Sequence, residues 1–338
     1  MELLMDPSWV FRQYDSQLFL NTVEGPGGDA TVLRLRHPVT GADTGQGLAL
    51  TTDGNHRWCR LEPRRGTAMV VAEAALNLAC AGADPLALVD CLNFGNPEHP
   101  EVMWQLSESI DGMADACRAL DIPVVGGNVS LYNESGGADI DPTPVVTLLG
   151  MVARLDRRPP GVHLVDGGPV YLLGPRSDDV GGSRWAARRA GGRPAGRLPD
   201  LDLAAHRRLC QLVRDLVAGG SLAGVHDVAD GGLATCLGEL VGRSGVGLVL
   251  EGVGAGELFS ESPSRVVVCL PAGGDTVAVE QRFREAGAAW ARVGTAGGAR
   301  LVVSDLVDLP VGVVTRRWRD ALPGALGPPA APPAAGVP

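Results

Sequence analysis

The amino-acid sequence predicts an α/β fold, more closely an α+β arrangement of two domains. Three observations lead to this prediction. Short apolar runs alternate with segments of helical period along most of the 338 residues. Between residues 84 and 134 the order is strand, helix, strand, which is typical of a parallel crossover. Residues 157–161, rich in arginine and proline, interrupt the pattern and predict a linker.

The first domain is expected over residues 31–156, after a leading segment of residues 1–30. In that leading segment, residues 6–15 predict a short helix that a glycine-rich turn ends. Thr67 is a plausible N-cap for a helix whose many alanines suit close packing on a sheet. This helix is expected over residues 67–81. The other expected elements of the domain are strands at 31–35, 47–51 and 144–152.

The strand–helix–strand unit is the centre of the first domain. Its expected strands are 86–90 and 122–125, and its helix is 100–120. Gly126 and Gly127 are expected to stop the second strand. Because the two strands should be parallel, the loops that follow them open at one edge of the sheet, where α/β proteins usually bind ligands.

Polar residues and glycines fill both expected loops. They are Asp90, Asn93 and Asn96 in the first loop, and Gly126, Gly127, Asn128, Ser130, Asn133 and Glu134 in the second. Paired glycines let backbone N–H groups approach an anion, and carboxylate and amide oxygens suit Mg²⁺. As a set these residues predict a phosphate and magnesium site, although each one alone is also a common turn former.

The second domain is expected over residues 165–322, before a tail of residues 323–338 whose proline and alanine content predicts disorder. His226, beside Asp227 at a strand end, is the best candidate for a functional histidine, with a structural hydrogen bond as the alternative. His206 is expected to be solvated. The expected strands are 170–173, 222–225, 248–250, 265–270 and 301–303, and the expected helices are 201–218, 233–241 and 277–286.

Composition excludes several classes of protein. The chain has no lysine, so neither a P-loop nor a protein-kinase site is present. The net charge of −10 disfavours a nucleic-acid surface. No apolar run approaches the ~20 residues of a membrane span, and no signal peptide is evident, so a cytoplasmic protein is expected. The seven cysteines are scattered along the chain and are expected to be free thiols. Cys91 is expected to be packed rather than catalytic.

Two consecutive motifs carry a family resemblance. The runs DCLNFGNPE from Asp90 and GNVSLYNE from Gly127 resemble the second half of the synthetase subunit of phosphoribosylformylglycinamidine synthase. The likeness extends to WVFRQYD (9–15), NTVEGPGGDA (21–30), DVADGGL (227–233) and LFSESPSR (258–265). The run GNHRW (54–58) departs from the family's Cys-Asn-Pro-Arg pattern. The resemblance implies an AIR synthase-like unit, in which a barrel- or sheet-forming domain precedes a second α/β domain.

The resemblance also implies roles for four residues. Asp90 and Gly127 would contact ATP, Asn128 would bind Mg²⁺, and Ser130 would contact the formylglycinamide ribonucleotide substrate. ATP and Mg²⁺ are the implied cofactors. No catalytic residue is assigned, because the family's catalytic histidine lies in a His-Asn-His-Pro motif of the first half, which this sequence does not contain.

The implied function is the second half of an ATP-dependent C–N ligase of purine biosynthesis, incomplete as this chain alone. Its implied partners are the missing first half or a second copy, a glutamine amidotransferase subunit and a small bridging subunit. Two alternatives remain open. One is a different enzyme of the superfamily, such as aminoimidazole ribonucleotide synthetase or thiamine-monophosphate kinase. The other is a non-catalytic, nucleotide-binding or scaffolding half.

Overall fold

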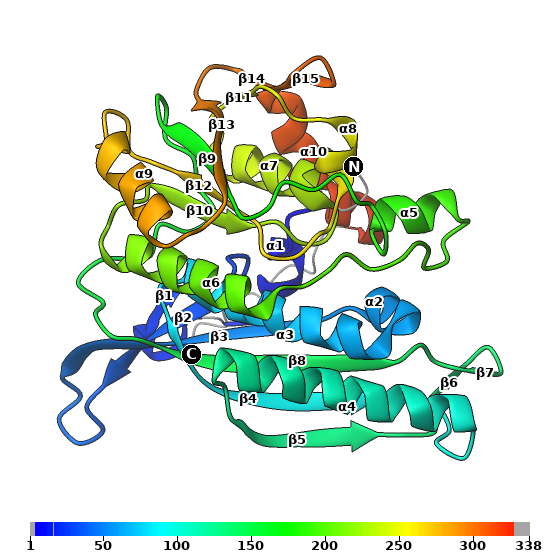
Figure 1. The fold of residues 1–338 in the computed structure, drawn as a ribbon. Helices are drawn as coiled ribbons and strands as arrows, with labels where there is room; N and C mark the ends of the chain where they lie inside the picture. Colours follow the sequence, from blue (N-terminus) through cyan, green and yellow to red (C-terminus); the bar gives the residue numbers. More distant parts are fainter. Residues whose placement is uncertain (1–3, 16, 328–338) are drawn as a thin grey trace.

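Two β-sheets and the helices packed against them make up the protein (Figure 1). The computed structural model describes residues 4–15 and 17–327. The first sheet is built from residues 22–152 and the second from residues 169–310. Together these elements confirm the mixed α/β class, with strands and helices in both parts of the chain.

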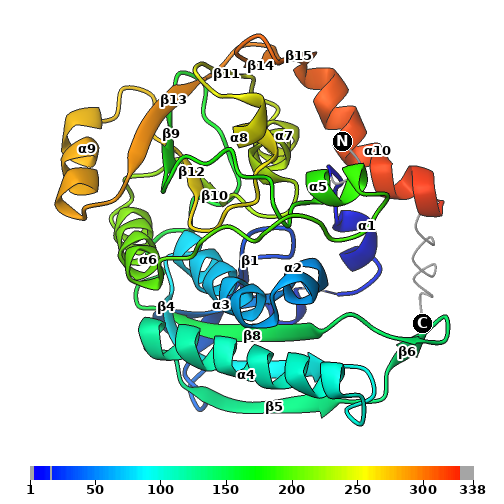
Figure 2. The same ribbon diagram turned by 45° about the vertical axis from the view of Figure 1, so that its right-hand side comes forward.

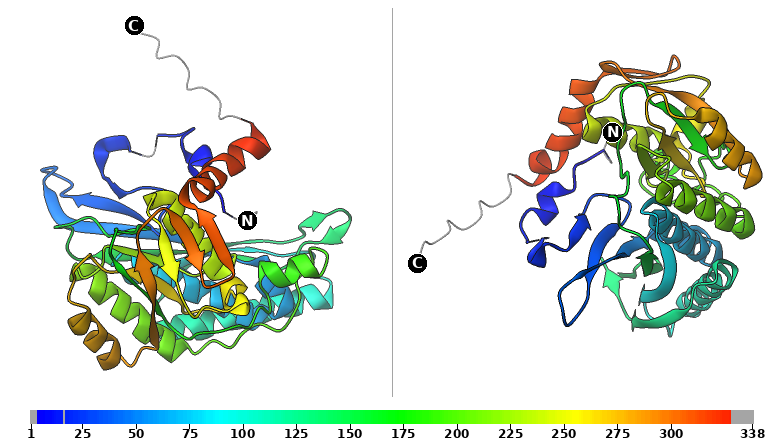
Figure 3. Two further views of the ribbon diagram at one scale, coloured as in Figure 1. Left: turned by 90° about the horizontal axis from the view of Figure 1, so that it is seen from above. Right: turned by 90° about the vertical axis from the view of Figure 1, so that its left-hand side faces the viewer.

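The first sheet has six strands in the order β1-β2-β3-β8-β4-β5 and is curled (Figure 3). All neighbouring pairs are antiparallel except β4 and β5, which run parallel. The predicted crossover is therefore confirmed. The strands are β1 (Thr22–Glu24), β2 (Thr31–Arg36), β3 (Asp43–Gly54), β4 (Asp84–Asn93), β5 (Val124–Ser130) and β8 (Thr143–Val152). A small hairpin of β6 (Glu134–Ser135) and β7 (Ala138–Asp139) follows β5.

Two long helices, α3 (Pro63–Cys80) and α4 (Pro100–Leu120), lie side by side on one face of this sheet (Figure 2). They come very close, because a Cβ on Gly112 of α4 would lie 2.0 Å from the carbonyl oxygen of Arg64 in α3. Proline begins each helix, where its missing N–H is not needed. Asp121, in the left-handed conformation, ends α4. The short helix α2 (His56–Leu61) precedes α3.

The opposite face of the first sheet is open among the described residues. Along β8, residues alternate between buried and half-exposed, and the half-exposed set points away from α3 and α4. Leu50 and Val89 on this face are 36% and 41% exposed. A sheet with one solvated face normally alternates apolar with polar residues, so apolar side chains on this face indicate a surface made for contact.

The second sheet has seven strands in the order β10-β12-β9-β13-β11-β14-β15 and is covered on both faces. Helices α6 and α9 pack on one face, toward the first domain, while α7 and α10 pack on the other (Figure 1). All five residues of its interior strand β9 are buried. The strands are β9 (Pro169–Leu173), β10 (Gly224–Asp227), β11 (Leu248–Leu250), β12 (Val266–Cys269), β13 (Trp290–Ala296), β14 (Arg300–Val303) and β15 (Val307–Pro310). The helices are α5 (Arg184–Arg189), α6 (Leu203–Ala218), α7 (Gly232–Ser244), α8 (Ala255–Phe259), α9 (Thr276–Glu285) and α10 (Val311–Leu326).

Several expected boundaries are corrected. The strand expected to stop at Gly126 continues through both glycines to Ser130, because their extended backbone pairs with β4. Thr67 is not an N-cap: it lies inside α3, where its hydroxyl donates to the carbonyl of Pro63 at 2.8 Å. His206 is fully buried rather than solvated, because α6 packs against α3 and the second sheet.

The two ends of the chain also differ from expectation. The leading segment contains only a short α1 (Ser8–Phe11) and a 3₁₀ turn (Leu18–Leu20), and its last part joins the first sheet as β1. The expected tail begins too early, because α10 runs through Pro323 to Leu326. Pro323 has no N–H to donate, so the carbonyl of Arg319, one turn earlier in α10, receives no helical hydrogen bond from it. Residues 328–338 lie outside the described residues. None of the helices over the described part is long and apolar enough to cross a membrane.

Candidate functional site

The four residues predicted to form a ligand site lie within β4 and β5 rather than in loops after them. In the parallel register Asp90 is paired with Gly127, and Cys91 with Asn128. Paired residues of neighbouring strands point to the same side of a sheet, and successive residues point to opposite sides. The four residues therefore divide between the two faces of the sheet.

Asp90 and Gly127 lie on the face that carries α3 and α4. Burial raises the pKa of the Asp90 carboxyl above its ordinary value. The carboxylate fills the space where a Gly127 side chain would be, since a Cβ there would come within 2.5 Å of it. Absence of a side chain at residue 127 is thus a packing requirement of this structure, whatever else the residue contacts.

Asn128 and Ser130 lie on the open face. Among the described residues, the side chain of Asn128 has a single hydrogen bond, from Nδ2 to the thiol of Cys91 at 3.9 Å, so its amide oxygen is available to a ligand. The hydroxyl of Ser130 is 3.3 Å from Asn133 Oδ1, and Asn133 Nδ2 donates to the carbonyls of Phe94 and Ser130 at 3.0 Å. Asn133 therefore holds the end of β5 and orients Ser130. One amide oxygen and one hydroxyl do not complete a six-coordinate Mg²⁺ shell, so further ligands must come from elsewhere.

Asn93 and Asn96, from the same predicted set, already have hydrogen-bond partners within the protein. Asn93 Nδ2 donates to the carbonyl of Thr143 at 3.2 Å and so ties β4 to β8. The backbone N–H of Asn96 donates to Asp139 at 2.7 Å, and Asp139 also contacts His99 Nδ1 at 2.7 Å. The contacts of Asp139 anchor the β6–β7 hairpin. The turn-forming alternative describes Asn96, whose Oδ1 accepts a hydrogen bond from the backbone N–H of Glu98 at 2.9 Å, whereas Asn93 lies in strand β4.

An acidic cavity of about 530 Å³ lies between the two domains, on the helix-covered side of the first sheet. Three strand ends and α3 supply its walls. Five acidic residues line it: Asp29, Asp53, Glu73, Asp227 and Glu239. Asn77 and His226 also line it. β3, which carries Asp53, is separated from β5 by β8 and β4, so about 14 Å of sheet lies between this cavity and Asn128.

His226 is the charged centre of the cavity. Its Nδ1 lies 2.6 Å from Asp29 Oδ1, and its Nε2 lies 2.9 Å from Glu239 Oε2. Burial opposes protonation, but the charge of Asp29 and the hydrogen bonds to both carboxylates raise the pKa of His226 well above its usual range. The imidazolium thus offsets two of the negative charges around it. His226 therefore lines the cavity. Its hydrogen bonds to Asp29 and Glu239 fit the structural alternative, and a functional role for His226 stays a prediction.

The remaining acids of the cavity are crowded together. Burial, reinforced by repulsion from Asp29, raises the pKa of Asp53 to about 6 and that of Asp227 to about 8. The pKa of Glu73 is raised by burial and by Asp53. Carboxylates held close together in this way favour either shared protons or a bound cation.

The donor atoms of this cavity fit a divalent metal ion. One potential ligand atom each from Asp29, His226 and Asp227 lies within 4.8 Å of the others; the protonated His226 has no free lone pair, so the two carboxylates are the ligands of this group. Asn77 donates through Nδ2 to Asp53 at 2.8 Å, which leaves its buried Oδ1 without a hydrogen-bond partner. An orphaned amide oxygen beside several carboxylates is the hard, oxygen-rich set that Mg²⁺ prefers.

Sequence reasoning did not find this cavity. Its acids come from residues 29, 53, 73 and 227, and no local pattern connects them. Two weak signals were present: Asp29 follows a glycine pair, and the His226-Asp227 pair ends a strand. Spacing within one segment cannot show that three distant strand ends meet.

The fold and these sites define a class of protein. Residues 27–152 match the N-terminal domain of AIR synthase related proteins, and residues 165–305 match their C-terminal domain. The chain therefore belongs to the AIR synthase related family.

Within this family the chain is similar to one particular protein, phosphoribosylformylglycinamidine synthase subunit PurL. It is 42% identical over 329 residues to PurL of Moorella thermoacetica, a match that covers 95% of this chain and 44% of the relative. With PurL of Thermomicrobium roseum the identity is 44% over 324 residues, covering 93% and 43%. The chain thus spans less than half the length of these relatives.

Solved structures show the same fold. Thermotoga maritima PurL complexed with FGAR aligns with a TM-score of 0.65 at 19% identity, covering 80% of this chain and 46% of that one. The protein tt0281 of Thermus thermophilus aligns with a TM-score of 0.61 at 23% identity, covering 84% and 91%. One such unit is therefore found both as part of a longer chain and as nearly a whole chain.

Proposed function

We propose that this chain supplies the second half of an ATP-dependent enzyme that converts formylglycinamide ribonucleotide to formylglycinamidine ribonucleotide. One observation carries the proposal: the similarity to PurL extends over 95% of this chain but only 44% of the relative. Such coverage favours PurL over a one-unit enzyme of the same family. The chain then needs a partner to complete it.

The open face of the first sheet is the place where that partner would act. Asn128 and Ser130 project from it, and neither has enough neighbours to form a complete site. Asn128 would offer its amide oxygen to Mg²⁺, and Ser130 its hydroxyl to the ribonucleotide. Asp90 and Gly127, which lie on the opposite face of the sheet, would contact ATP. A first half or a second copy, docked on the same face, would provide the remaining ligands.

In the proposed chemistry the γ-phosphate of ATP moves to the glycinamide carbonyl oxygen of the substrate, and ammonia then displaces phosphate at that carbon to give the amidine. Magnesium would neutralise the charge of the transferring group. The residues of this chain would bind and orient the two substrates. Ammonia would come from a glutamine amidotransferase subunit, with a small bridging subunit between the two, in the cytoplasm.

A second candidate function is cation binding in the acidic cavity. The observation that favours it is the buried Oδ1 of Asn77, which has no hydrogen-bond partner and lies among carboxylates of raised pKa. Asp29, Asp227 and Asn77 would hold the ion. A metal there would replace the shared protons and remove the mutual repulsion of the acids, and so would stabilise the junction between the domains.

Reconstitution tests the half-enzyme proposal. The purified chain is mixed with a separate polypeptide that carries the first half of a PurL relative, and amidine formation is measured with ATP, Mg²⁺ and ammonium. We expect turnover from the mixture and none from either polypeptide alone. Robust turnover by this chain alone would refute the half-enzyme hypothesis. A stable, nucleotide-binding but inactive complex would support the scaffolding alternative instead.

A further inference from the structure

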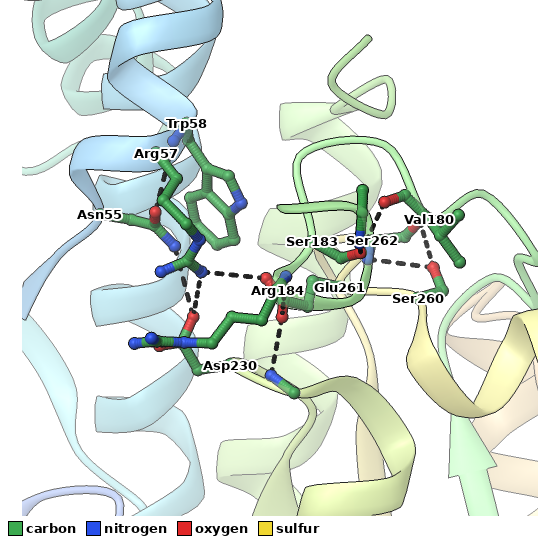
Figure 4. A network of polar contacts seen from close by, with 12 residues as sticks. Asn55, Arg57, Trp58, Val180, Ser183, Arg184, Asp230, Ser260, Glu261 and Ser262 are labelled. Atoms are coloured by element: carbon green, nitrogen blue, oxygen red, sulfur yellow. Dashed lines mark hydrogen bonds and ion pairs between the residues drawn. The ribbon is translucent and has the colours of Figure 1, made fainter. Parts of the chain in front are cut away.

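A cluster of charged side chains joins the two domains beside the acidic cavity (Figure 4). Arg57, in the first turn of α2, donates to Asp230 at 2.6 Å and to Glu261 at 3.2 Å. Asp230 also accepts two hydrogen bonds from Arg184, at 2.9 and 2.6 Å. Arg57 belongs to the first domain, whereas the other three residues belong to the second.

This cluster is buried, and several hydrogen bonds fix the positions of its side chains. The side chain of Glu261 is 0% exposed and that of Arg57 is 7% exposed. Glu261 also accepts hydrogen bonds from the backbone N–H groups of Arg184 and Gly231, at 2.9 and 2.8 Å. A buried carboxylate with three donors holds its position firmly, because moving it would leave those groups unsatisfied.

The same two chain segments contribute to both the cluster and the cavity. One segment ends β3 with Asp53, which lines the cavity, and reaches Arg57 four residues later. The other ends β10 with Asp227, which lines the cavity, and reaches Asp230 three residues later. The Arg57–Asp230 contact therefore ties together the two segments that place Asp53 and Asp227 on opposite walls.

We propose that Arg57 is a positioning residue that sets the separation of Asp53 and Asp227, and thereby the cation affinity of the acidic cavity. The proposal rests on the cation site suggested above. The bond from Arg57 to Asp230 holds the two segments at a fixed distance, so it sets how closely Asp53, which is hydrogen-bonded to Asn77, and Asp227 can approach one cation. Groups that hold metal ligands in place through hydrogen bonds act in the same way. Their loss typically lowers the affinity for the metal about 10- to 100-fold.

Arg184 provides a matched control. It contacts the same Asp230 carboxylate at similar distances, but it begins α5 in the second domain. Within the described residues its side chain has no hydrogen bond or ion pair to the segment that carries Asp53. Removing its side chain takes away a bond to Asp230 without untying the two segments. If the cluster only stabilised the fold, the two arginine variants would behave alike.

The test compares Arg57→Gln with Arg184→Gln in the full chain. Binding of Mn²⁺ is followed by electron paramagnetic resonance, and binding of Mg²⁺ by calorimetry. We expect Arg57→Gln to weaken cation binding at least about ten-fold and Arg184→Gln to change it less than about three-fold. In a double-mutant cycle with Asp53→Asn, the effect of Arg57→Gln should shrink, because the carboxylate that Arg57 positions is gone.

Each outcome decides a separate question. If the wild-type chain binds neither ion, the cation site itself is refuted. If the wild type binds and Arg57→Gln binds equally well, or both arginine variants lose affinity equally, the positioning role is overturned. Should Arg57→Gln not fold, Asp230→Asn removes the same bond from the other side; affinity equal to that of Arg184→Gln would then refute the proposal.

Discussion

The carboxylate of Asp90 lies directly over the α-carbon of Gly127, in the space that a side chain at residue 127 would fill. A Cβ built on Gly127 would meet both carboxylate oxygens at 2.5 Å. Gly126, its neighbour in the same strand, is different: its nearest contact would be Val89 at 3.9 Å. Two adjacent glycines that look equivalent in the sequence thus have different structural roles.

This difference predicts different stabilities for two alanine variants. Gly127→Ala should lower the free energy of unfolding by about 1–3 kcal/mol, because the added methyl group displaces a half-buried carboxylate. Gly126→Ala should change it by less than about 0.5 kcal/mol. Urea denaturation measures both. The double variant Asp90→Ala, Gly127→Ala should recover part of the loss, and equal stability of the two single variants would contradict the packing argument.

Asn128 and Ser130 should affect activity without affecting stability. In the assembled enzyme, Asn128→Ala should raise the requirement for Mg·ATP at least about ten-fold, and Ser130→Ala should chiefly raise the requirement for the ribonucleotide. The melting temperature should hardly change, since over the described chain the side chain of Asn128 has just one weak hydrogen bond, to Cys91 Sγ at 3.9 Å.

Asn133→Ala is the control for a structural role at the same site. It removes two hydrogen bonds of 3.0 Å to backbone carbonyls, so it should lower the melting temperature. A folded Asn128→Ala complex with unchanged Mg·ATP affinity and turnover would remove β5 from the active site.

Divalent cations should stabilise the chain through the acidic cavity. At a Mg²⁺ concentration about 100 times the dissociation constant, binding to the folded state adds about 2.7 kcal/mol of stability. Asp227→Asn should abolish this increment, whereas Asp200→Asn, whose side chain is 83% exposed, should retain it. Thermal melts with Mg²⁺ and with NaCl at equal ionic strength measure the difference. Equal stabilisation by the two salts would count against the site.

Buried His206 should make stability depend on pH. Burial lowers the pKa of His206 to about 4, from 6.5. Since the folded state disfavours the proton that the unfolded state accepts, the stabilisation is present above pH 6.5 and is lost as the pH falls toward 4. The full loss corresponds to about 3 kcal/mol.

Unfolding experiments between pH 7 and 4 compare the wild type with His206→Gln, which cannot titrate. Over this range the free energy of unfolding of the wild type should fall by about 3 kcal/mol more than that of the variant. His163→Gln, at an exposed histidine, serves as the control and should follow the wild type. Parallel pH profiles for wild type and His206→Gln would contradict the assignment.

The open face of the first sheet should cause association. We expect a homodimer of the isolated chain, or a complex when the missing half is present, because apolar side chains such as Leu50 and Val89 lie there. Leu50→Arg should shift the mass in light scattering toward the monomer. Val277→Arg, at a 73% exposed apolar residue on α9, should not. A monodisperse wild-type monomer at micromolar concentration would exclude this role.

Local patterns in the sequence were enough to predict most of the elements. The helix at 100–120 and the strand at 248–250 agree with α4 and β11, because period and flanking turn residues lie within the segment itself. The motifs from Asp90 and Gly127 were also enough to indicate the family. Local patterns failed at Gly126 and Gly127, since pairing with β4, a non-local contact, keeps them extended.

Only the tertiary structure decided which residues share a site. The sequence placed Asp90, Gly127, Asn128 and Ser130 together, but strand pairing puts two of them on each face of the sheet. The acidic cavity arises where α3 and two distant strand ends meet, bringing Asp29, Asp53, Glu73 and Asp227 together from 199 residues of chain, counted from 29 to 227. Their shared cavity depends on packing between the domains, and packing, unlike periodicity, cannot be read from neighbouring residues.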